Sequence, residues 1–291
     1  MRIVLGPNQY GKAEIRVLAV DRSAPEHRVK DLTVSTALRG DFAAAHLAGD
    51  NAHVLATDTQ KNTVFAFARD GIGEIDDFGL RLARHLAGAY PWIGGARVEV
   101  AEHPWQRIAS HGHAFARSGS GETRTATVTV ESGREYVLSG LSDLVLLKTT
   151  GSSFAGFPRD RYTTLAETDD RILATAVTAR WRHADPADRA PHAEVRAALV
   201  ETFATLDSKA LQQTLYAMGE AVLARHRGIA EIRLSLPNRH HFLQDLSPFG
   251  LDNPNVVYHA DDRPYGLIEG TVLRDDAPEP GPAWDGTPGF C

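Results

Sequence analysis

The strongest constraint on the fold of this chain of 291 residues is an order of strand and helix patterns that occurs twice. In residues 1–134 and again in residues 135–274, the patterns read strand, strand, helix, helix, strand, strand. A local echo joins Val54–Thr57 (VLAT) and Ile172–Thr175 (ILAT), but four residues match by chance easily, so the order of elements is the better evidence. We expect an α+β protein of two ββααββ units, each an antiparallel sheet with helices on one face.

The first half opens with two strand patterns. Apolar and polar residues alternate over residues 32–38, which directs one side of this strand toward a core. A preceding strand at residues 13–20 is joined to it by residues 21–30, a link too short for a crossover helix, so the pair is expected to be antiparallel. The other elements expected in this half are strands over residues 53–57, 97–102, 106–115 and 123–130, and helices over residues 60–69 and from Asp76 or Asp77 to Leu86.

The second half contains two amphipathic helix patterns. Apolar side chains recur at helical spacing from Val195 to Leu206 and from Leu211 to Val222, and Gly228 can end the second helix. The strands expected in this half cover residues 135–148, 171–181, 231–236 and 265–274.

Composition excludes several classes of protein. Hydrophobic residues make up 43% and charged residues 23%, which is ordinary for a globular chain. Cys291 is the only cysteine, so disulfides within the chain and cysteine metal clusters are excluded. The net charge of −6 does not suggest nucleic acid as a partner, and no apolar run is long enough for a membrane span. We expect a cytoplasmic protein with a flexible tail over residues 275–291, where Pro, Gly and acidic residues dominate.

Two candidate residues lie where strand and helix patterns meet in the first half. Thr57 and Asp58 stand at the start of an expected helix, where backbone amides favour an anion, although a threonine there is also an ordinary helix cap. Lys12 lies at the start of a strand, where a lysine is usually a solvated edge residue. If Lys12 is buried, its lowered pKa makes it a base near neutral pH.

The segment KTTGSSFAGF and the residues after it are the least ordinary part of the sequence. Phe154 and Phe157 lie in this loop, where a ring can stack on a flat ligand. Arg171 follows, and its planar fork suits a carboxylate-like or urea-like group. The alternative is that Arg171 pairs with Asp169 or Asp170.

Polar residues at the end of a later strand offer hydrogen bonds and proton transfer. In SLPNRHHF, Asn238 can hold a small polar molecule and His240 can transfer a proton at neutral pH, unless it is an ordinary surface histidine. A metal site at His103, His111 and His113 is a weaker alternative, because no carboxylate motif accompanies them. The sequence has no P-loop, GxGxxG or GxSxG motif, so no nucleotide or flavin is indicated.

Taken together, these segments resemble the urate oxidase (uricase) family. The resemblance runs from Tyr10-Gly11-Lys12 through ATDTQKNTVFAFAR, the KTTGSSFAGF to TARW block, LQQTLYAMGE, SLPNRHHF and DRPYGLIEGTV. It implies the tandem T-fold, assembled as a tunnel-shaped homotetramer with active sites at subunit interfaces. It also implies oxidation of urate by molecular oxygen and water to 5-hydroxyisourate and hydrogen peroxide, with neither metal nor organic cofactor.

The resemblance assigns roles to nine residues of this chain. Lys12, Thr57 and His240 match the catalytic proton relay. Phe154 matches the ring that stacks on the purine, Arg171 and Gln212 match the pair that grips it from opposite sides, and Asn238 matches the oxygen site above it. The backbone amides of Asp58 and Leu211 match those that contact substrate. Lys12, Thr57 and Asp58 are expected from one subunit and the others from its neighbour.

Two positions depart from the family pattern. Leu211 stands where valine is frequent, a mild change if only its amide is used, and Ala176 stands where aspartate is common. The alternatives are another T-fold enzyme acting on a purine or pterin, and a purine-binding protein without catalysis.

Overall fold

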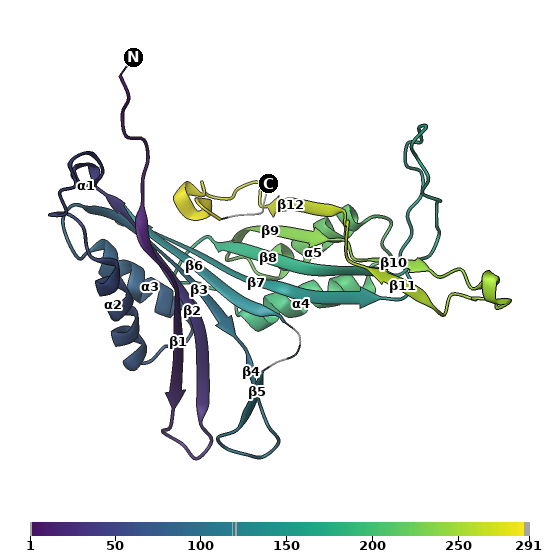
Figure 1. Cartoon of the computed structure of the whole chain (residues 1–291), viewed down its shortest axis with the longest axis horizontal. Helices are drawn as coiled ribbons and strands as arrows, with labels where there is room; N and C mark the ends of the chain where they lie inside the picture. The colour runs from purple at the N-terminus through teal and green to yellow at the C-terminus, as the bar shows by residue number, and fades with distance from the viewer. Residues whose placement is uncertain (1, 118, 120, 288–291) are drawn as a thin grey trace. The chain divides into compact units, whose positions relative to one another are not determined.

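The computed structural model of the chain describes residues 2–117, 119 and 121–287, so Phe290 and Cys291 lie outside the described residues. The chain divides into two compact units. Unit 1 comprises Met1–Leu141, Arg182–Asp188 and Pro278–Gly286, and unit 2 comprises Ser142–Trp181, Arg189–Ala277 and Thr287–Cys291. Figure 1 gives the labels of the helices and strands in each.

In unit 1, a sheet carries two helices. Its hydrogen-bonded neighbours follow the order β1 to β2 to β3 to β6 to β7, and the first three of these pairings are antiparallel. Helix α2 packs on β1, and α3 packs on β3 and β6 (Figure 1). The bounds are β1 Tyr10–Asp21, β2 Arg28–Gly40, α2 Thr57–Arg69, α3 Ile75–Ala87, β3 Ile93–His103, β6 Thr123–Glu131 and β7 Arg134–Lys148.

The apolar periodicity of the sequence explains how these elements pack. Phe78, Leu82 and Leu86 of α3 are all buried, at 0%, 0% and 1% exposure, as one helical stripe facing the sheet. Leu32 and Val34 of β2 are buried as well. They are two residues apart and therefore point to the same face of the sheet, while Thr33 between them is more exposed. The core of unit 1 therefore lies between its helices and its sheet.

Unit 2 has the same kind of construction. Its neighbours follow the order β7 to β8 to β9 to β12, and β12 is antiparallel to β9. Helix α5 packs on β9, on β12 and against α4. The bounds are β8 Leu173–His183, α4 His192–Thr205, α5 Leu211–Arg225, β9 Ile229–Pro237 and β12 Leu267–Leu273, and a separate hairpin is formed by β10 His240–Leu243 and β11 Tyr258–Asp261.

The predicted α+β class, with two helices and antiparallel strands in each half, is confirmed. The structure departs from the predicted elements in four places. Residues 53–56 form no strand, and α2 already begins at Thr57. The strand expected over residues 106–115 is instead a hairpin of β4 Trp105–Arg107 and β5 Phe115–Arg117. A short helix α1 Ala43–Ala48 and the hairpin β10–β11 carry too weak a periodicity to be found from sequence.

Part of the expected tail packs within unit 1. Arg182 donates to the carbonyl of Pro278 (2.7 Å), Arg97 donates to the carbonyl of Asp285, and Arg39 forms an ion pair with the carboxylate of Asp285 (3.1 Å). The segment includes a short 3-10 helix, Gly281–Trp284. Arginine side chains thus supply the bonds that a Pro- and Gly-rich segment lacks among its own backbone groups.

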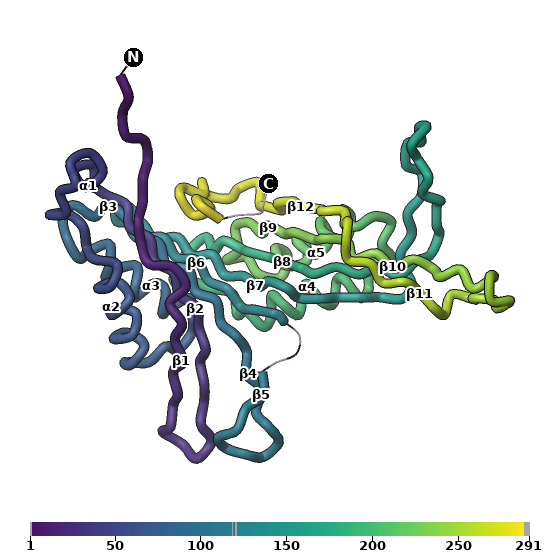
Figure 2. Tube along the Cα trace, viewed as in Figure 1, coloured from purple at the N-terminus to yellow at the C-terminus, as the bar shows by residue number. Residues whose placement is uncertain are grey.

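Two further findings concern the rest of the chain. The connection from β7 to β8 projects from the sheet of unit 2, as the tube in Figure 2 shows. Among the described residues, no helix combines the length and the apolar character needed to cross a membrane.

Candidate active site

Hydrogen bonds join Lys12 of β1 to the segment that leads into α2. The backbone N–H of Lys12 donates to Oγ1 of Thr36 (3.3 Å), whose hydroxyl donates to Oε1 of the buried Gln60 (2.7 Å). Gln60 Nε2 donates to the carbonyl of Leu55 (3.3 Å). Each buried polar group of this series has a partner, which fixes Lys12 relative to the start of α2.

The backbone around Lys12 departs from a regular strand. A Cβ atom on Gly11 would lie 1.7 Å from the carbonyl oxygen of Thr36, so only glycine permits this approach of β1 to β2. The pairing register with β2 shifts between Lys12 and Ile15, and Glu14 has a φ of 56°. Such irregularities change the direction of neighbouring side chains and recur beside active sites.

The ammonium group of Lys12 is half-buried. It has neither an ion pair nor a hydrogen bond with the part of the chain that the structure describes. A solvated edge lysine would be more exposed, and a structural one would have an acidic partner. Lys12 is therefore available to a group that the chain itself does not supply.

Helix α2 begins without a side-chain cap. The N-cap residue is Ala56, and Thr57 is the first residue inside the helix, so the capping role considered for Thr57 is wrong. The first intrahelical bond runs from the N–H of Gln60 to the carbonyl of Ala56 (3.2 Å). The amides of Thr57, Asp58 and Thr59 therefore lack intrahelical acceptors and form an anion-binding position.

The carboxylate of Asp58 is directed along the surface of α2. It accepts hydrogen bonds from Lys61 and from Asn62 (2.9 Å). The bond to Lys61 and its charge hold the pKa of Asp58 below the ordinary value, and Lys12 contributes a smaller electrostatic effect. Because the side chain is engaged in this way, the backbone amide of Asp58 is the group left for a ligand.

In unit 2, Phe154 and Arg171 are in contact. The guanidinium carbon of Arg171 lies 5.1 Å from the centroid of the Phe154 ring, and Phe157 stacks on Phe154 at 5.0 Å and 16°. The Nε of Arg171 is buried and has no hydrogen-bond partner among the described residues. Burial lowers the pKa of this guanidinium, which nevertheless stays charged. Arg171 makes no ion pair with Asp169 or Asp170, so that alternative is wrong.

The start of α5 presents Leu211 and Gln212. The N-cap residue is Ala210, which has no side-chain cap, and the first intrahelical bond runs from the N–H of Thr214 to the carbonyl of Ala210 (3.2 Å). The amides of Leu211 and Gln212 therefore have no intrahelical acceptor. The Gln212 side chain is exposed and has no partner within the described residues.

Asn238 and His240 follow the end of β9. The N–H of Asn238 donates to the carbonyl of Gly266 (2.8 Å), and Asn238 forms a β-bridge with Thr175 of β8. His240 stacks on Phe242 and, with neighbours that include Ala174 and Asp261, lines a pocket of about 440 Å³. The side-chain amide of Asn238 and the imidazole of His240 thus follow the end of β9 at positions two apart in the sequence.

The candidate residues are divided between the two units. Lys12, Thr57 and Asp58 belong to unit 1, and Phe154, Arg171, Leu211, Gln212, Asn238 and His240 belong to unit 2. Sequence reasoning missed the buried hydroxyl groups of Ser152 and Thr175, which have no partner among the described residues. The sequence carries no clear signal for them, since serine and threonine alone do not reveal burial.

Of the three histidines considered for a metal site, His103 has a side-chain hydrogen-bond partner. His103 Nε2 lies 2.8 Å from the hydroxyl of Thr33, and burial lowers the pKa of His103. Within residues 2–117, 119 and 121–287, no group of three or more histidine, cysteine, aspartate or glutamate residues is arranged to hold a metal ion.

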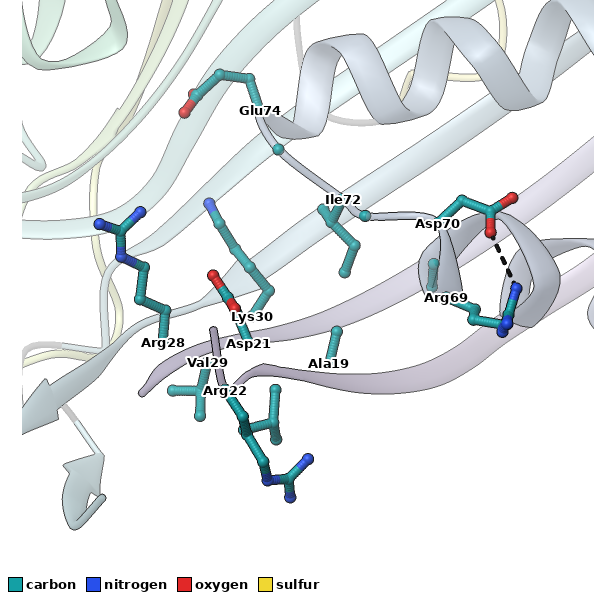
Figure 3. Close-up of a pocket in the computed structure, with 14 residues that line it drawn as sticks. Ala19, Asp21, Arg22, Arg28, Val29, Lys30, Arg69, Asp70, Ile72 and Glu74 are labelled. Atoms are coloured by element: carbon teal, nitrogen blue, oxygen red, sulfur yellow. Dashed lines mark hydrogen bonds and ion pairs between the residues drawn. The ribbon is translucent and has the colours of Figure 1, made fainter. Parts of the chain in front are cut away.

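A different pocket of unit 1, of about 580 Å³, lies at the other ends of β1 and α2 (Figure 3). None of the candidate residues lines it. Its wall carries charges of both signs, among them Arg22, Arg28 and Glu74, while Arg69 and Asp70 pair with each other at 3.4 Å. This mixture favours no ligand of one charge.

Comparisons with known proteins agree with one another. The chain matches the family model described as Uricase over residues 8–129 and 137–269. A protein named Uricase from Arthrobacter globiformis is 53% identical, covering 100% of this chain and 96% of that protein. One of the same name from Dictyostelium discoideum is 38% identical, covering 92% and 96%.

Solved structures give the same result. The crystal structure of uricase from Arthrobacter globiformis has a TM-score of 0.93 at 52% identity, covering 98% of this chain and 99% of that one. A uricase from Bacillus fastidious has a TM-score of 0.80 at 26% identity, covering 94% and 96%.

Proposed function

The chain belongs to the uricase family, and on this basis we propose that it oxidises urate. Urate, molecular oxygen and water give 5-hydroxyisourate and hydrogen peroxide. The observation that carries the proposal is the pair of Arg171 and Phe154, in which the half-buried arginine has a buried Nε donor without a partner among the described residues, beside an aromatic ring. A flat anion that presents adjacent acceptor atoms at one edge accepts the hydrogen bonds of Arg171 and stacks its face on Phe154.

Four groups of unit 2 bind the purine in this proposal. Phe154 stacks on one face of the ring system. Arg171 donates two parallel hydrogen bonds to one edge, and Gln212 holds the opposite edge. The free backbone amide of Leu211 at the start of α5 adds a donor for the developing negative charge, which the positive end of the helix favours.

Proton transfer is assigned to Lys12, Thr57 and His240. Triplet oxygen reacts poorly with a closed-shell molecule, so the enzyme makes urate electron-rich by removing a further proton. Lys12, in its neutral amine form, accepts this proton through the hydroxyl of Thr57 and becomes the ammonium, and His240 extends the relay. Asn238 and Thr57 hold oxygen, and later peroxide or water, above the ring. The proposal includes neither a metal ion nor an organic cofactor.

Assembly completes the site in this proposal. Lys12, Thr57 and Asp58 of one subunit meet the purine-binding residues of its neighbour in a homotetramer. The support is that each unit has donors without internal partners, and that unit 2 exposes large apolar side chains, among them Leu147, Phe242 and Leu267. We place the protein in the cytoplasm, in agreement with a sequence that has one cysteine.

Urate consumption and oxygen uptake, followed together, test the function. The purified protein is incubated with urate in the presence and absence of EDTA, and peroxide is measured at the end. We expect equal molar amounts of urate and oxygen consumed and peroxide formed, unchanged by EDTA. Urate loss without oxygen uptake would contradict the proposed reaction, and loss of activity with EDTA would favour a metal enzyme.

A further inference from the structure

Asp170 directly precedes Arg171 but is bonded to a different segment. Its carboxylate accepts hydrogen bonds from the hydroxyl of Thr150 (2.7 Å), the N–H of Gly151 (2.9 Å) and the N–H of Ser152 (3.4 Å). The Thr150 bond above all, with the backbone donors, holds the pKa of Asp170 below its ordinary value. The ionised carboxylate of Asp170 thus holds residues 150–152 close to the backbone of Arg171, its neighbour in the sequence.

Residues 151–153 of this segment are hydrogen-bonded on one edge to Arg171 and on the other edge to Ser208. The N–H of Arg171 donates to the carbonyl of Ser152 (2.8 Å). On its other edge, the N–H of Ser153 donates to the carbonyl of Ser208 (2.7 Å), and the N–H of Ser208 donates to the carbonyl of Gly151 (2.9 Å). These bonds join Arg171 to Ser208 through one short stretch of backbone.

Ser208 carries the connection into the first turn of α5. Its buried Oγ lies 2.7 Å from Oγ1 of the buried Thr214 and donates to the carbonyl of Ala210 (3.2 Å). Ala210 is the N-cap of α5 and is followed by Leu211 and Gln212. A continuous series of hydrogen bonds therefore runs from Asp170 to the helix start that faces Arg171 in the proposed site.

The Arg171 side chain depends on this segment for its direction. It has no hydrogen bond or ion pair with the described residues, so its place is set by its own backbone and by the ring of Phe154. Phe154 is itself held by backbone bonds to Thr168, at 2.8 and 3.0 Å, directly after the segment that Asp170 fastens.

We propose that Asp170 is a positioning residue that sets the gap between Arg171 and the start of α5, and thereby the affinity for the flat purine. This inference rests on the proposed function. Asp170 does not touch substrate in this proposal. It acts through the segment 150–153, as its three hydrogen bonds and the bonds of that segment indicate.

The test compares two variants of Asp170 with a control at the neighbouring residue. Asp170→Ala removes all three acceptor bonds, and Asp170→Asn removes the charge while keeping the volume. Asp169 is also exposed and acidic but makes no contact within the described residues, so Asp169→Asn removes the same charge one residue away. Thr150→Val, which removes one donor without changing the shape, is a fourth variant.

Affinity and turnover are measured separately. Urate binding is titrated under nitrogen, where no turnover occurs, and KM and kcat are measured in air. For Asp170→Ala we expect the Kd and KM for urate to rise about tenfold, while kcat at saturating urate stays within about twofold. The reason is that the lost charge-assisted bonds position the purine clamp, which consists of Arg171 and the start of α5, and do not position the proton relay of Lys12, Thr57 and His240. Asp170→Asn and Thr150→Val should show a smaller rise, and Asp169→Asn none.

Several outcomes would overturn the role of Asp170. They are an unchanged Kd in both Asp170 variants, an equal rise in Asp169→Asn, or a fall in kcat with unchanged affinity. If Asp170→Ala does not fold, Asp170→Asn and Thr150→Val decide the question. If the wild-type protein binds urate under nitrogen but does not oxidise it, the proposed function is refuted. The role of Asp170 can still be tested in that case, because the titration measures urate affinity without turnover.

Discussion

At residue 171, a half-buried arginine lies beside an aromatic ring, and its buried Nε has no hydrogen-bond partner among the described residues. An unsatisfied donor in such a place costs stability, and a ligand that accepts its hydrogen bond recovers that cost. Lys12 is the corresponding residue of unit 1, a half-buried lysine whose side chain forms no ion pair with the described residues, although its charge acts on the carboxylate of Asp58. Both residues are held by the backbone around them more than by their own side-chain bonds.

Arg171→Lys should lose urate binding. Lysine offers a point charge in place of the planar fork, so two parallel hydrogen bonds become one, and we expect KM to rise at least tenfold. Steady-state kinetics with urate measure this. Arg159→Lys is the matched control, because Arg159 lies over the Phe157 ring, 5.7 Å from its centroid, outside the proposed clamp. An unchanged KM in Arg171→Lys would remove Arg171 from the binding role.

Lys12→Met should remove most turnover while leaving urate binding intact. Methionine keeps the length of the side chain but cannot carry a proton, and general acid–base groups contribute about 10²–10⁴-fold to rate. Oxygen uptake and anaerobic urate titration separate the two effects. Lys30→Met, at the far end of the same hairpin where Lys30 pairs with Glu102 at 2.6 Å, should keep full kcat. Full activity of Lys12→Met would refute the relay.

At the scale of the element, helices α2 and α5 share an alanine at the N-cap, whereas the absence of a side-chain cap is common to α1, α3 and α4 as well. Both begin after an alanine, and neither has a side-chain hydrogen bond at its cap. Serine, threonine, aspartate and asparagine are preferred at this position because they stabilise the helix. The amides that remain free at both helix starts are those that the proposed function assigns to substrate. Helix stability and ligand binding therefore compete for the same N–H groups.

Ala56→Asp should therefore raise stability and lower affinity. An aspartate at this N-cap accepts the amides of the first turn, which typically adds about 0.5–2 kcal/mol to the free energy of unfolding, but it occupies the amide of Asp58. Thermal unfolding and KM for urate measure the two effects. Ala56→Gly leaves the amides free and should keep the KM of the wild type. A stabilised Ala56→Asp variant with unchanged KM would exclude these amides from the site.

At the scale of the whole molecule, the proposed site requires two copies of the chain. Two variants that are each impaired alone should then complement each other. Co-expression of Lys12→Met with Arg171→Lys gives mixed oligomers in which some sites draw the intact Lys12 from one subunit and the intact Arg171 from the other. We expect activity in the mixture well above that of either variant alone, measured as urate oxidation per milligram. Activity no higher than the sum of the parents would contradict a shared site.

The order of helices and strands was predictable because each element has a local periodicity of apolar residues. The stripe of Phe78, Leu82 and Leu86 predicts a helix, and the structure confirms it. Residues 53–57 carry a short apolar run that fits a strand or the approach to a helix equally well, and the bonds of Gln60 and Leu55 favour the helix. The division of the chain at residues 134/135 into duplicated units stays a prediction.

Residue types alone determined which chemistry this chain can offer: a lysine, a threonine and a histidine for proton transfer, an arginine fork, and an aromatic ring. The tertiary structure decided which of these groups have partners. The carboxylate of Asp170 accepts hydrogen bonds from residues 150–152 and makes no ion pair with the guanidinium of Arg171, and the carbonyl of Asp285 accepts a hydrogen bond from Arg97, 188 positions away. The physical reason is that periodicity records local burial, whereas the pairing of polar groups depends on the path of the whole chain.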